Sequence, residues 1–501
     1  MRRTDWIALA LSLAAVLAAF LIADRIFERL PHLEDEWAYI WQAQVASKGQ
    51  LSIPSPEHPK SILIPFVVDH NGQRFGKYPP VWPVVLAFGE RLDARAWVNP
   101  LLAGLGIWLT YLLGKKVFSA RVGVLTAFLT LASPFFLINS GTLLSHPLSY
   151  VLSTIFALAW LDTFLSQPEE GTYPLIPKWL TVLVAGLSLG LLTLTRPLTG
   201  IGVAFPFFIH GIILLLRNPR EVKLQVACVG GITLGVASLL FLWQYAVTGN
   251  PLLNPYTLWW SYDRIGFGVG IGTAADGHNW NHAWDNLKIS LNSGWHDLFG
   301  WASISWLFLP FGFWAARRNR SAWLAGSVYW SLAAVYMLYW VGAWVYGPRY
   351  YYEGFYSITL LSAAAVFWLA GQGRIVKWIT WALLFVLIGY NLAFYMPERL
   401  TEMKGLFGVR RELLAPFQTS QAAELTPALV IVHPRQDWRE YGALMELEDP
   451  WLTTSFIFAY SRGEEIDAAL AKDFPGRQVI HYYMNGSFEP PTPAAKPLEQ
   501  K

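Results

Sequence analysis

The 501-residue chain has little charge and a single cysteine. Only 14% of its residues are Asp, Glu, Lys or Arg, against about 25% in ordinary soluble domains. Charged side chains are therefore too few to cover a soluble protein of this length. With Cys228 as the one cysteine, an internal disulfide is excluded. The formal net charge of +3 is small and indicates no nucleic-acid partner.

The chain is instead rich in long hydrophobic segments. Apolar residues make up 54% of it, and they gather in runs of about 20, the length that crosses a bilayer as a helix. The run 6–23 is longer than the apolar core of a signal peptide, so we expect it to be a retained helix. The pattern predicts a mainly α-helical polytopic membrane protein with about eleven transmembrane helices, at 6–23, 96–114, 122–140, 147–165, 179–195, 198–216, 224–246, 298–316, 322–344, 355–372 and 377–396.

The distribution of Lys and Arg predicts the orientation of these helices. Basic residues are enriched in loops on the cytoplasmic side of a membrane. Here they fall at the N-terminus and in alternate short loops, which places the N-terminus in the cytoplasm. The two long loops, about 24–95 and 247–297, then face outward. The residues concerned are Arg2, Arg3, Lys115, Lys116, Arg121, Lys178, Arg217, Arg220, Lys223, Arg317, Arg318, Arg320, Arg374 and Lys377.

Three regions follow from this pattern. Residues 1–396 form the predicted transmembrane domain. Residues 397–490 contain strand-like runs at 428–432, 455–460 and 478–483 with a helix-like segment at 464–473, so we expect a small extracytoplasmic α/β domain. The Pro-rich segment 491–501 has the composition of a disordered tail. The location that fits best is a bacterial inner membrane.

The loop after the first predicted span contains three successive carboxylates, Glu34, Asp35 and Glu36. From Trp37 onward, apolar residues recur at helical spacing through Trp41 to Val45. This pattern predicts a helix lying in the membrane interface with its Trp side chains toward lipid. Such a helix would hold the acidic cluster at headgroup depth.

This loop resembles that of a known family. Asp35-Glu36, Tyr39 three residues after the Glu, the segment 49–54 (Gly-x-Leu-x-x-Pro) and Lys77 before a Pro pair are similar to the first outer loop of the C-type (GT-C) membrane glycosyltransferases. Within that superfamily the loop is similar to protein O-mannosyltransferases and to the aminoarabinose transferases that modify lipid A. One difference is Gly76, where the aminoarabinose transferases have Glu; it weakens any inference of a bound metal.

The resemblance implies an enzyme, a hexosyl or pentosyl transferase. It would move a sugar from a polyprenyl-phosphate donor to a glycan, lipid or protein acceptor on the outer face, with inversion at the anomeric carbon. It further implies that Asp35 is the base, with Glu36 the second candidate, and that Lys77 lies near the donor phosphate. A carboxylate within reach of an acceptor hydroxyl can contribute roughly 10²–10⁴-fold as a base. A soluble nucleotide-sugar donor is disfavoured, since neither a Gly-Lys-Thr phosphate loop nor a dinucleotide fingerprint occurs in the sequence.

Two arginines extend the set of phosphate-binding candidates. Arg196 and Arg349 lie in predicted outer loops, against the cytoplasmic bias of basic residues, so a specific role is indicated. Arg forms bidentate contacts with phosphate, whereas Lys acts as a point charge. The alternatives are anchoring to lipid headgroups or an ion pair such as Arg349 with Glu353.

Further polar and aromatic residues of the outer loops are candidates for shaping the substrate site. His146 could orient Asp35, contact the acceptor or bind a metal. His278 and His282, four residues apart, suit metal ligation only weakly without a third ligand, so a divalent metal ion stays open and no other cofactor is indicated. The substrate-shaping candidates are Tyr39, Tyr78, His146, Asp263, His278, Tyr350 and Glu353.

The main alternative function is a transporter or flippase of a lipid-linked glycan. An ion-coupled carrier typically has charged residues near the bilayer midplane, broken helices and repeated halves. By the span assignment above, no charged residue lies near the middle of a helix. The unusual polar groups gather at the outer ends, which favours an enzyme working at the membrane interface.

Overall fold

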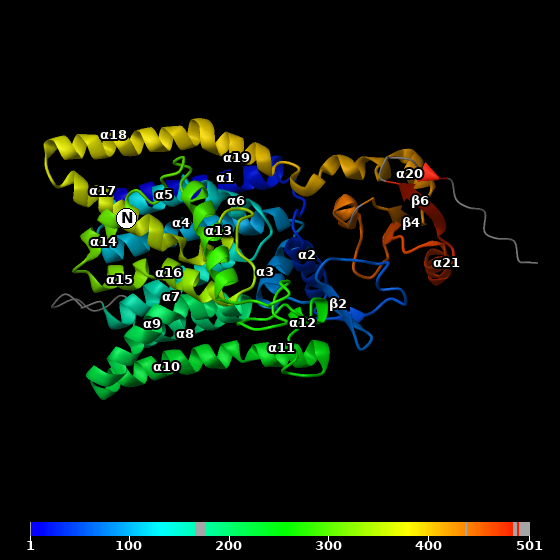
Figure 1. The fold of residues 1–501 in the computed structure, drawn as a ribbon, viewed down its shortest axis with the longest axis horizontal. Coiled ribbons are helices and arrows are strands. Elements are labelled where there is room, and N and C mark those ends of the chain that lie inside the picture. The colour runs from blue at the N-terminus through cyan, green and yellow to red at the C-terminus, as the bar shows by residue number, and fades with distance from the viewer. Residues whose placement is uncertain (1, 166–176, 436–437, 484–487, 490–501) are drawn as a thin grey trace, which may run out of the picture.

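The computed structural model describes residues 2–165, 177–435, 438–483 and 488–489. The predicted disordered segment 491–501 lies outside the described residues. The chain forms an elongated helical bundle with a small α/β unit at one end (Figure 1). The bundle contains α1 (Arg3–Arg25), α4 (Val98–Val117), α5 (Ala120–Leu131), α6 (Pro134–Gly141), α7 (His146–Phe164), α8 (Lys178–Thr195), α9 (Pro197–Arg217), α10 (Arg220–Ala237), α11 (Leu239–Thr248), α14 (Leu309–Ala316), α15 (Arg320–Gly326), α16 (Val328–Val335), α17 (Phe355–Ala370), α18 (Arg374–Tyr390) and α19 (Met396–Met403).

These helices confirm the mainly α-helical, polytopic class. Within the described ranges, nine helical segments are long and apolar enough to cross a membrane, or ten if the pair α5 and α6, bent by 60°, is one span. The predicted count of eleven is not confirmed, because the expected span 298–316 is helical only over α14. Gly300 and Ala302 there have φ of +64° and +48°, which no α-helix permits, and Pro310 suits a helix's first turn.

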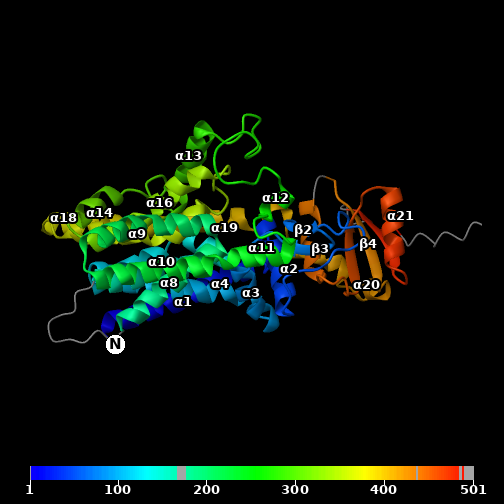
Figure 2. The ribbon, with the colours of Figure 1, turned by 90° about the horizontal axis from the view of Figure 1, so that it is seen from below.

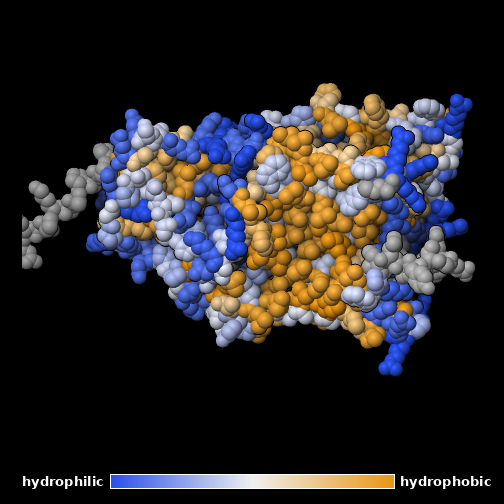
Figure 3. All heavy atoms as spheres, turned by 180° about the vertical axis from the view of Figure 1, so that it is seen from behind, coloured by the Kyte–Doolittle hydropathy of each residue, from blue (hydrophilic) through white to orange (hydrophobic). Residues whose placement is uncertain are grey.

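On the face that Figure 3 shows, the bundle carries a broad apolar belt with hydrophilic residues at both ends. Contacts bring the loops predicted to be cytoplasmic together at the end that carries the N-terminus. Lys115 Nζ lies 2.7 Å from Asp5 Oδ1, and Asn319 Nδ2 donates to the Val117 carbonyl over 2.7 Å. The α/β unit lies at the opposite end (Figure 1). The two ends of the belt therefore carry different sets of polar residues.

The first long loop is structured. It contains α2 (Glu34–Ser47), α3 (Val81–Arg91) and an antiparallel sheet of order β1-β3-β2, formed by β1 (Ile53–Pro54), β2 (Val67–His70) and β3 (Gln73–Gly76). Asn71 and Gly72 connect β2 to β3 with positive φ at both positions, as the tight turn of a β-hairpin requires. This hairpin places Lys77 directly after β3.

The second long loop contains α12 (Tyr256–Trp259) and α13 (Trp280–Asp297). Figure 2 shows α13 projecting sideways from the bundle, while α12 lies beside β2 and close to α2. The two long loops therefore meet at the end of the bundle that faces the α/β unit.

The α/β unit is built on a four-stranded sheet of order β5-β4-β6-β7. Its strands are β4 (Ala428–His433), β5 (Phe456–Tyr460), β6 (Gln478–Tyr483) and β7 (Phe488–Glu489), and its helices are α20 (Ser420–Glu424) and α21 (Glu464–Asp473). β4 pairs in parallel with both β5 and β6. The first three strands and α21 lie where the residue pattern predicts them.

The predicted lipid-facing position of the α2 tryptophans is wrong. Trp37 and Trp41 are 2% and 3% exposed. Trp37 shares a hydrophobic core with Val409 and Leu414. Trp41 belongs to a second core with Val45, Ile53 and Val67, against which Trp451 packs. The tryptophans of α2 are therefore covered by the C-terminal part of the chain and by the first loop itself, and they do not face lipid.

Candidate active site

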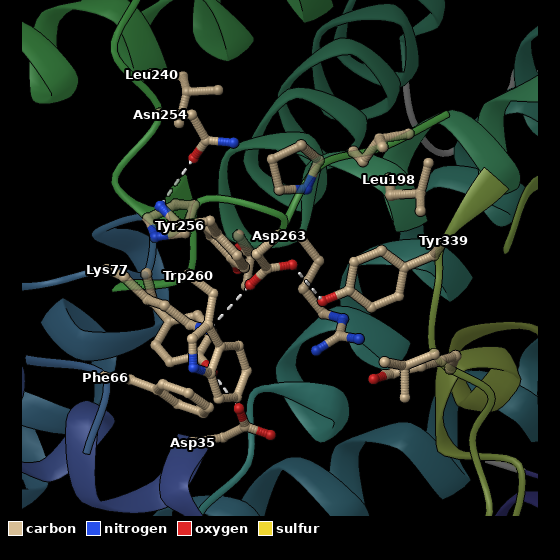
Figure 4. Close-up of a pocket in the computed structure, with 18 of the residues that line it drawn as sticks. Asp35, Phe66, Lys77, Leu198, Leu240, Asn254, Tyr256, Trp260, Asp263 and Tyr339 are labelled. Carbon is tan, nitrogen blue, oxygen red and sulfur yellow. Dashed lines mark hydrogen bonds and ion pairs between the residues drawn. The ribbon is translucent and has the colours of Figure 1, made fainter. Parts of the chain in front are cut away.

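A cavity of about 550 Å³ lies where the two long loops meet the ends of the helices (Figure 4). Residues of α9 and α11 contribute apolar lining, and the first loop, the second loop and the segments around Arg196 and Arg349 contribute polar lining. Its charged lining residues are Glu34, Asp35, Lys77, Arg196, Asp263 and Arg349. Its volume falls within the range of about 300–1,000 Å³ that is usual for small-molecule sites.

Asp35 occupies the first turn of α2, where a carboxylate is favoured by the helix dipole. Its Oδ1 accepts a hydrogen bond from the Tyr78 hydroxyl, and its Oδ2 lies 3.4 Å from Arg349 Nη2. The side chain is 22% exposed, so a ligand in the cavity can reach it. Asp35 is thus an oriented and accessible carboxylate, which suits a general base.

Glu36 lies outside the cavity and is 2% exposed. Its Oε1 accepts a hydrogen bond from the Leu143 backbone N–H at 2.7 Å, and its Oε2 accepts from the N–H groups of His32 and Leu33 at 2.9 and 3.0 Å. Burial raises the pKa of Glu36 to about 7, although these three donors act in the opposite direction. The geometry therefore disfavours Glu36 as the second base and gives it a structural role at the start of α2.

Lys77 is buried, with a side chain 3% exposed, and pairs with Asp263 over 3.2 Å. Its Nζ lies 3.5 Å from the centre of the Phe66 ring and 4.8 and 5.1 Å from those of Tyr256 and Trp260. Burial lowers the pKa of Lys77, while the charge of Asp263 opposes that shift. The lysine Nζ therefore contacts both a carboxylate and aromatic faces, the surroundings that suit an ammonium group.

Asp263 comes from the second long loop and is 2% exposed. Its Oδ1 accepts hydrogen bonds from the Tyr339 hydroxyl at 3.0 Å and from Trp340 Nε1 at 3.1 Å. Its Oδ2 accepts from Lys77 at 3.2 Å. One carboxylate thereby ties the segment after β3 and the segment after α16 to the second loop.

Arg196 lies in the break between α8 and α9, where its φ of −144° and ψ of 89° are not helical. Its guanidinium donates to Ser145 Oγ at 3.2 Å and to the Tyr336 hydroxyl at 3.3 Å. Its Nε lies 3.3 Å from Oε1 of Glu353. All three nitrogens of Arg196 therefore have partners, since Nε also donates to Thr199 at 3.2 Å.

Arg349 begins a 3-10 helix, Arg349–Gly354, next to Asp35. The predicted alternative pair with Glu353 does not form, because Arg349 pairs with Asp35 and Glu353 with Arg196. Nη1 of Arg349 is buried and has no hydrogen-bond partner among the described residues. This nitrogen is a donor that a bound anion could use.

The remaining candidates fall into three groups. Tyr39, Tyr78 and Tyr350 line the cavity, as do Asp35, Lys77, Arg196, Asp263 and Arg349. His146 and Glu353 form a buried layer behind Arg196, with His146 Nδ1 3.1 Å from Glu353 Oε1. His278 lies elsewhere: its Nε2 is 2.9 Å from the Met337 carbonyl, and it lines a separate cavity of about 190 Å³.

The site also contains residues that the sequence interpretation missed. Glu34 lies beside Asp35 in the cavity wall, and the aromatic side chains Phe66, Tyr336 and Tyr339 complete it. The acidic run at 34–36 contained a signal for Glu34. No sequence signal distinguished these three aromatic residues, because the chain is rich in Phe, Trp and Tyr and many other aromatic residues were equally good candidates.

Comparison with solved structures identifies the fold. ArnT from Cupriavidus metallidurans bound to undecaprenyl phosphate aligns with a TM-score of 0.57 and 14% identity over 96% of this chain and 93% of that one. The chain therefore has a GT-C-like fold, the fold of ArnT. Apo ArnT aligns with a TM-score of 0.55 and 15% identity, over 95% of this chain and 92% of its own. The Archaeoglobus fulgidus oligosaccharyltransferase in complex with Zn and sulfate aligns with a TM-score of 0.52 and 13% identity. The alignment covers 93% of this chain and 67% of that one. Neither a family model nor a curated protein matches the sequence.

A divalent metal is not supported by the donor set of the cavity. Within the residues that the structure describes, no group of three or more His, Cys, Asp and Glu side chains could hold an ion. Asp35 is engaged by Tyr78 and Arg349, and Asp263 by Lys77 and two neutral donors. These two carboxylates of the cavity are therefore engaged by protein donors.

Proposed function

We propose that this chain is an inverting glycosyltransferase that moves a sugar from a polyprenyl-phosphate donor to an acceptor hydroxyl at the outer face of the membrane. The observation that carries the proposal is the pairing of Asp35 with Arg349 inside one cavity. Asp35 is an accessible carboxylate, and the neighbouring Arg349 guanidinium has a nitrogen without a hydrogen-bond partner among the described residues. The pair therefore supplies a base and an anion-binding group at neighbouring positions.

Asp35 takes the proton of the acceptor hydroxyl as that oxygen attacks the anomeric carbon of the donor. The bond between this carbon and the phosphate oxygen breaks, and its electron pair leaves with the polyprenyl phosphate. Attack from the side opposite the leaving group inverts the configuration. Tyr78 holds one oxygen of Asp35, which leaves the carboxylate oriented toward the cavity.

The leaving phosphate gains negative charge, which cations must stabilise. Arg349 offers its unpartnered Nη1, and Arg196 and Lys77 line the same cavity. Support comes from ArnT, solved with undecaprenyl phosphate on the same fold. The apolar lining from α9 and α11 suits the first isoprene units of such a carrier.

The orientation completes the proposal. The N-terminus is cytoplasmic, and the C-terminal domain predicted at 397–490 is extracytoplasmic, in a bacterial inner membrane. Support for this orientation comes from two contacts that place basic loops at the N-terminal end: Lys115 pairs with Asp5, and Asn319, next to Arg318 and Arg320, contacts Val117. The transmembrane domain is residues 1–396, and the acceptor is a glycan, lipid or protein hydroxyl.

The test uses purified full-length protein in lipid nanodiscs with a panel of hexosyl and pentosyl polyprenyl phosphates. Release of free polyprenyl phosphate by the wild type, with a loss of roughly 10²–10⁴-fold in Asp35→Asn, supports the proposal. Asp285→Asn, the same change at a carboxylate 61% exposed on the second loop, is the control. Equal release by wild type and Asp35→Asn would contradict the role of Asp35. No release from any donor would contradict the activity.

A further inference from the structure

The Lys77–Asp263 pair presents a chemical problem for a phosphate-binding lysine. Asp263 neutralises Lys77 in the structure, at 3.2 Å and with both side chains 3% exposed or less. A cation already paired with a carboxylate attracts a phosphate much less than an unpaired one. Figure 4 shows the two side chains turned toward each other within the cavity.

We propose that Asp263 and the donor phosphate compete for Lys77, so that donor binding transfers the lysine from the carboxylate to the phosphate. This inference rests on the proposed function and adds a positioning role for Asp263. Asp263 holds the ammonium group in the cavity before the donor arrives. It takes the lysine back when polyprenyl phosphate leaves, which favours product release.

Asp263 can lose its hydrogen bond from Lys77 and still accept two others. Its Oδ1 accepts hydrogen bonds from Tyr339 at 3.0 Å and Trp340 at 3.1 Å, independently of Lys77. A buried carboxylate stripped of all donors would be strongly destabilised, whereas one that keeps two stays solvated by the protein. The transfer of Lys77 therefore leaves Asp263 with two hydrogen bonds.

Lys77 is equally suited to the exchange. Its ammonium group has three N–H donors, of which the structure engages one with Asp263. The rest of its surroundings are ring faces, with Phe66 and Tyr256 at 3.5 and 4.8 Å from Nζ. These faces attract a cation without fixing the direction of its N–H bonds. The ammonium group can thus turn toward a phosphate in the cavity with little displacement.

The experiment measures equilibrium binding of undecaprenyl phosphate to full-length protein in nanodiscs, so that it does not depend on turnover. Asp263→Asn should bind at least about fivefold more tightly than wild type, the lower end of ordinary coupling between sites. Lys77→Met should bind more weakly. The tightening must disappear in the double variant Lys77→Met/Asp263→Asn. Asp285→Asn should bind as wild type does.

Three outcomes would overturn the exchange. Weaker binding of undecaprenyl phosphate by Asp263→Asn would show that the carboxylate only holds the second loop in place. Tightening that persists without Lys77 would show a general effect of charge. If both Asp263→Asn and the smaller Asp263→Ser fail to fold, as judged by thermal unfolding, the pair is structural. Wild type that binds no undecaprenyl phosphate would instead overturn the proposed function itself.

Separate measurements of KM and kcat distinguish the exchange of Lys77 between Asp263 and phosphate from a purely structural role of Asp263. Asp263→Asn should lower the donor KM while kcat also falls, because product is held longer. Damage to the loop would raise KM and lower kcat together. Asp263→Glu, which retains the charge, should restore donor affinity toward that of wild type.

Discussion

The hydroxyl of Tyr78 donates a hydrogen bond to Oδ1 of Asp35. This bond joins the first turn of α2 to the segment between β3 and α3. Gln42 Nε2 donates to the Tyr78 carbonyl over 2.8 Å and holds the same segment from α2. The carboxylate is thereby oriented by two contacts between α2 and Tyr78, and its direction depends on the hairpin that precedes Lys77.

Tyr78→Phe should slow sugar transfer by roughly tenfold to a hundredfold, because a hydrogen bond to a charged group contributes about 1.5–3 kcal/mol. The ring remains to pack against Tyr39, whose centroid lies 4.5 Å away, so the fold should survive. The measurement is kcat/KM for release of polyprenyl phosphate. Tyr245→Phe, at an α11 residue 60% exposed, is the control. A rate equal to wild type would remove Tyr78 from the orientation of Asp35.

Arg349→Ala should weaken donor binding by roughly tenfold to a hundredfold, since it removes a charge-assisted contact to the phosphate. Arg349→Lys should recover only part of this affinity, because a point charge cannot form a bidentate contact. The measurement is the dissociation constant for polyprenyl phosphate. Arg318→Ala, at an exposed residue between α14 and α15, should bind as wild type does. Unchanged affinity in Arg349→Ala would return Arg349 to a purely structural pairing with Asp35.

Glu36→Gln should lower stability without abolishing catalysis by the folded protein. Gln has one acceptor oxygen, so its amide group would face backbone N–H donors that Glu36 satisfies, at a cost of about 1–3 kcal/mol. Activity per folded molecule that fell as far as in Asp35→Asn would reinstate Glu36 as a catalytic candidate.

The same variant has a predicted pH dependence. Burial raises the pKa of Glu36 from 4.5 to about 7, so the folded state binds the proton more tightly than the unfolded state does. The stability from this proton is fully present below about pH 4.5 and is lost as the pH rises through about 7. The melting temperature of wild type minus that of Glu36→Gln should therefore be larger at pH 5 than at pH 8. Glu57→Gln, at an exposed residue of the same loop, is the control variant.

The sidedness of the α/β unit can be tested by cysteine labelling. With Cys228 replaced by Ser, a cysteine in place of Lys472 on α21 should react with a membrane-impermeant maleimide from outside the inner membrane of spheroplasts. A cysteine in place of Arg318 should react only after permeabilisation. Both native residues are exposed, so reactivity reports the side of the membrane rather than burial. The reverse pattern would invert the proposed orientation.

The sequence determined those features that depend on neighbouring residues. The length of an apolar run sets whether a helix can cross a bilayer, so ten of the eleven expected spans are helical segments of the structure, the bent pair counted as one. Strands β4, β5 and β6 were also predictable, because their apolar runs and flanking turn residues are local signals. The resemblance of the first loop likewise depended on short motifs around Asp35 and Lys77.

Tertiary structure decided how those local features meet. Asp35 and Glu36 are adjacent in sequence, yet successive helix positions point about 100° apart, and only the packing of α2 set which of them faces the cavity. Lys77 and Asp263 are 186 residues apart, so no local pattern could pair them. Trp37 has the side chain of an interfacial anchor, and its burial depends on Val409 and Leu414 far along the chain. Periodicity describes a face of an element, whereas contacts between distant elements determine what that face meets.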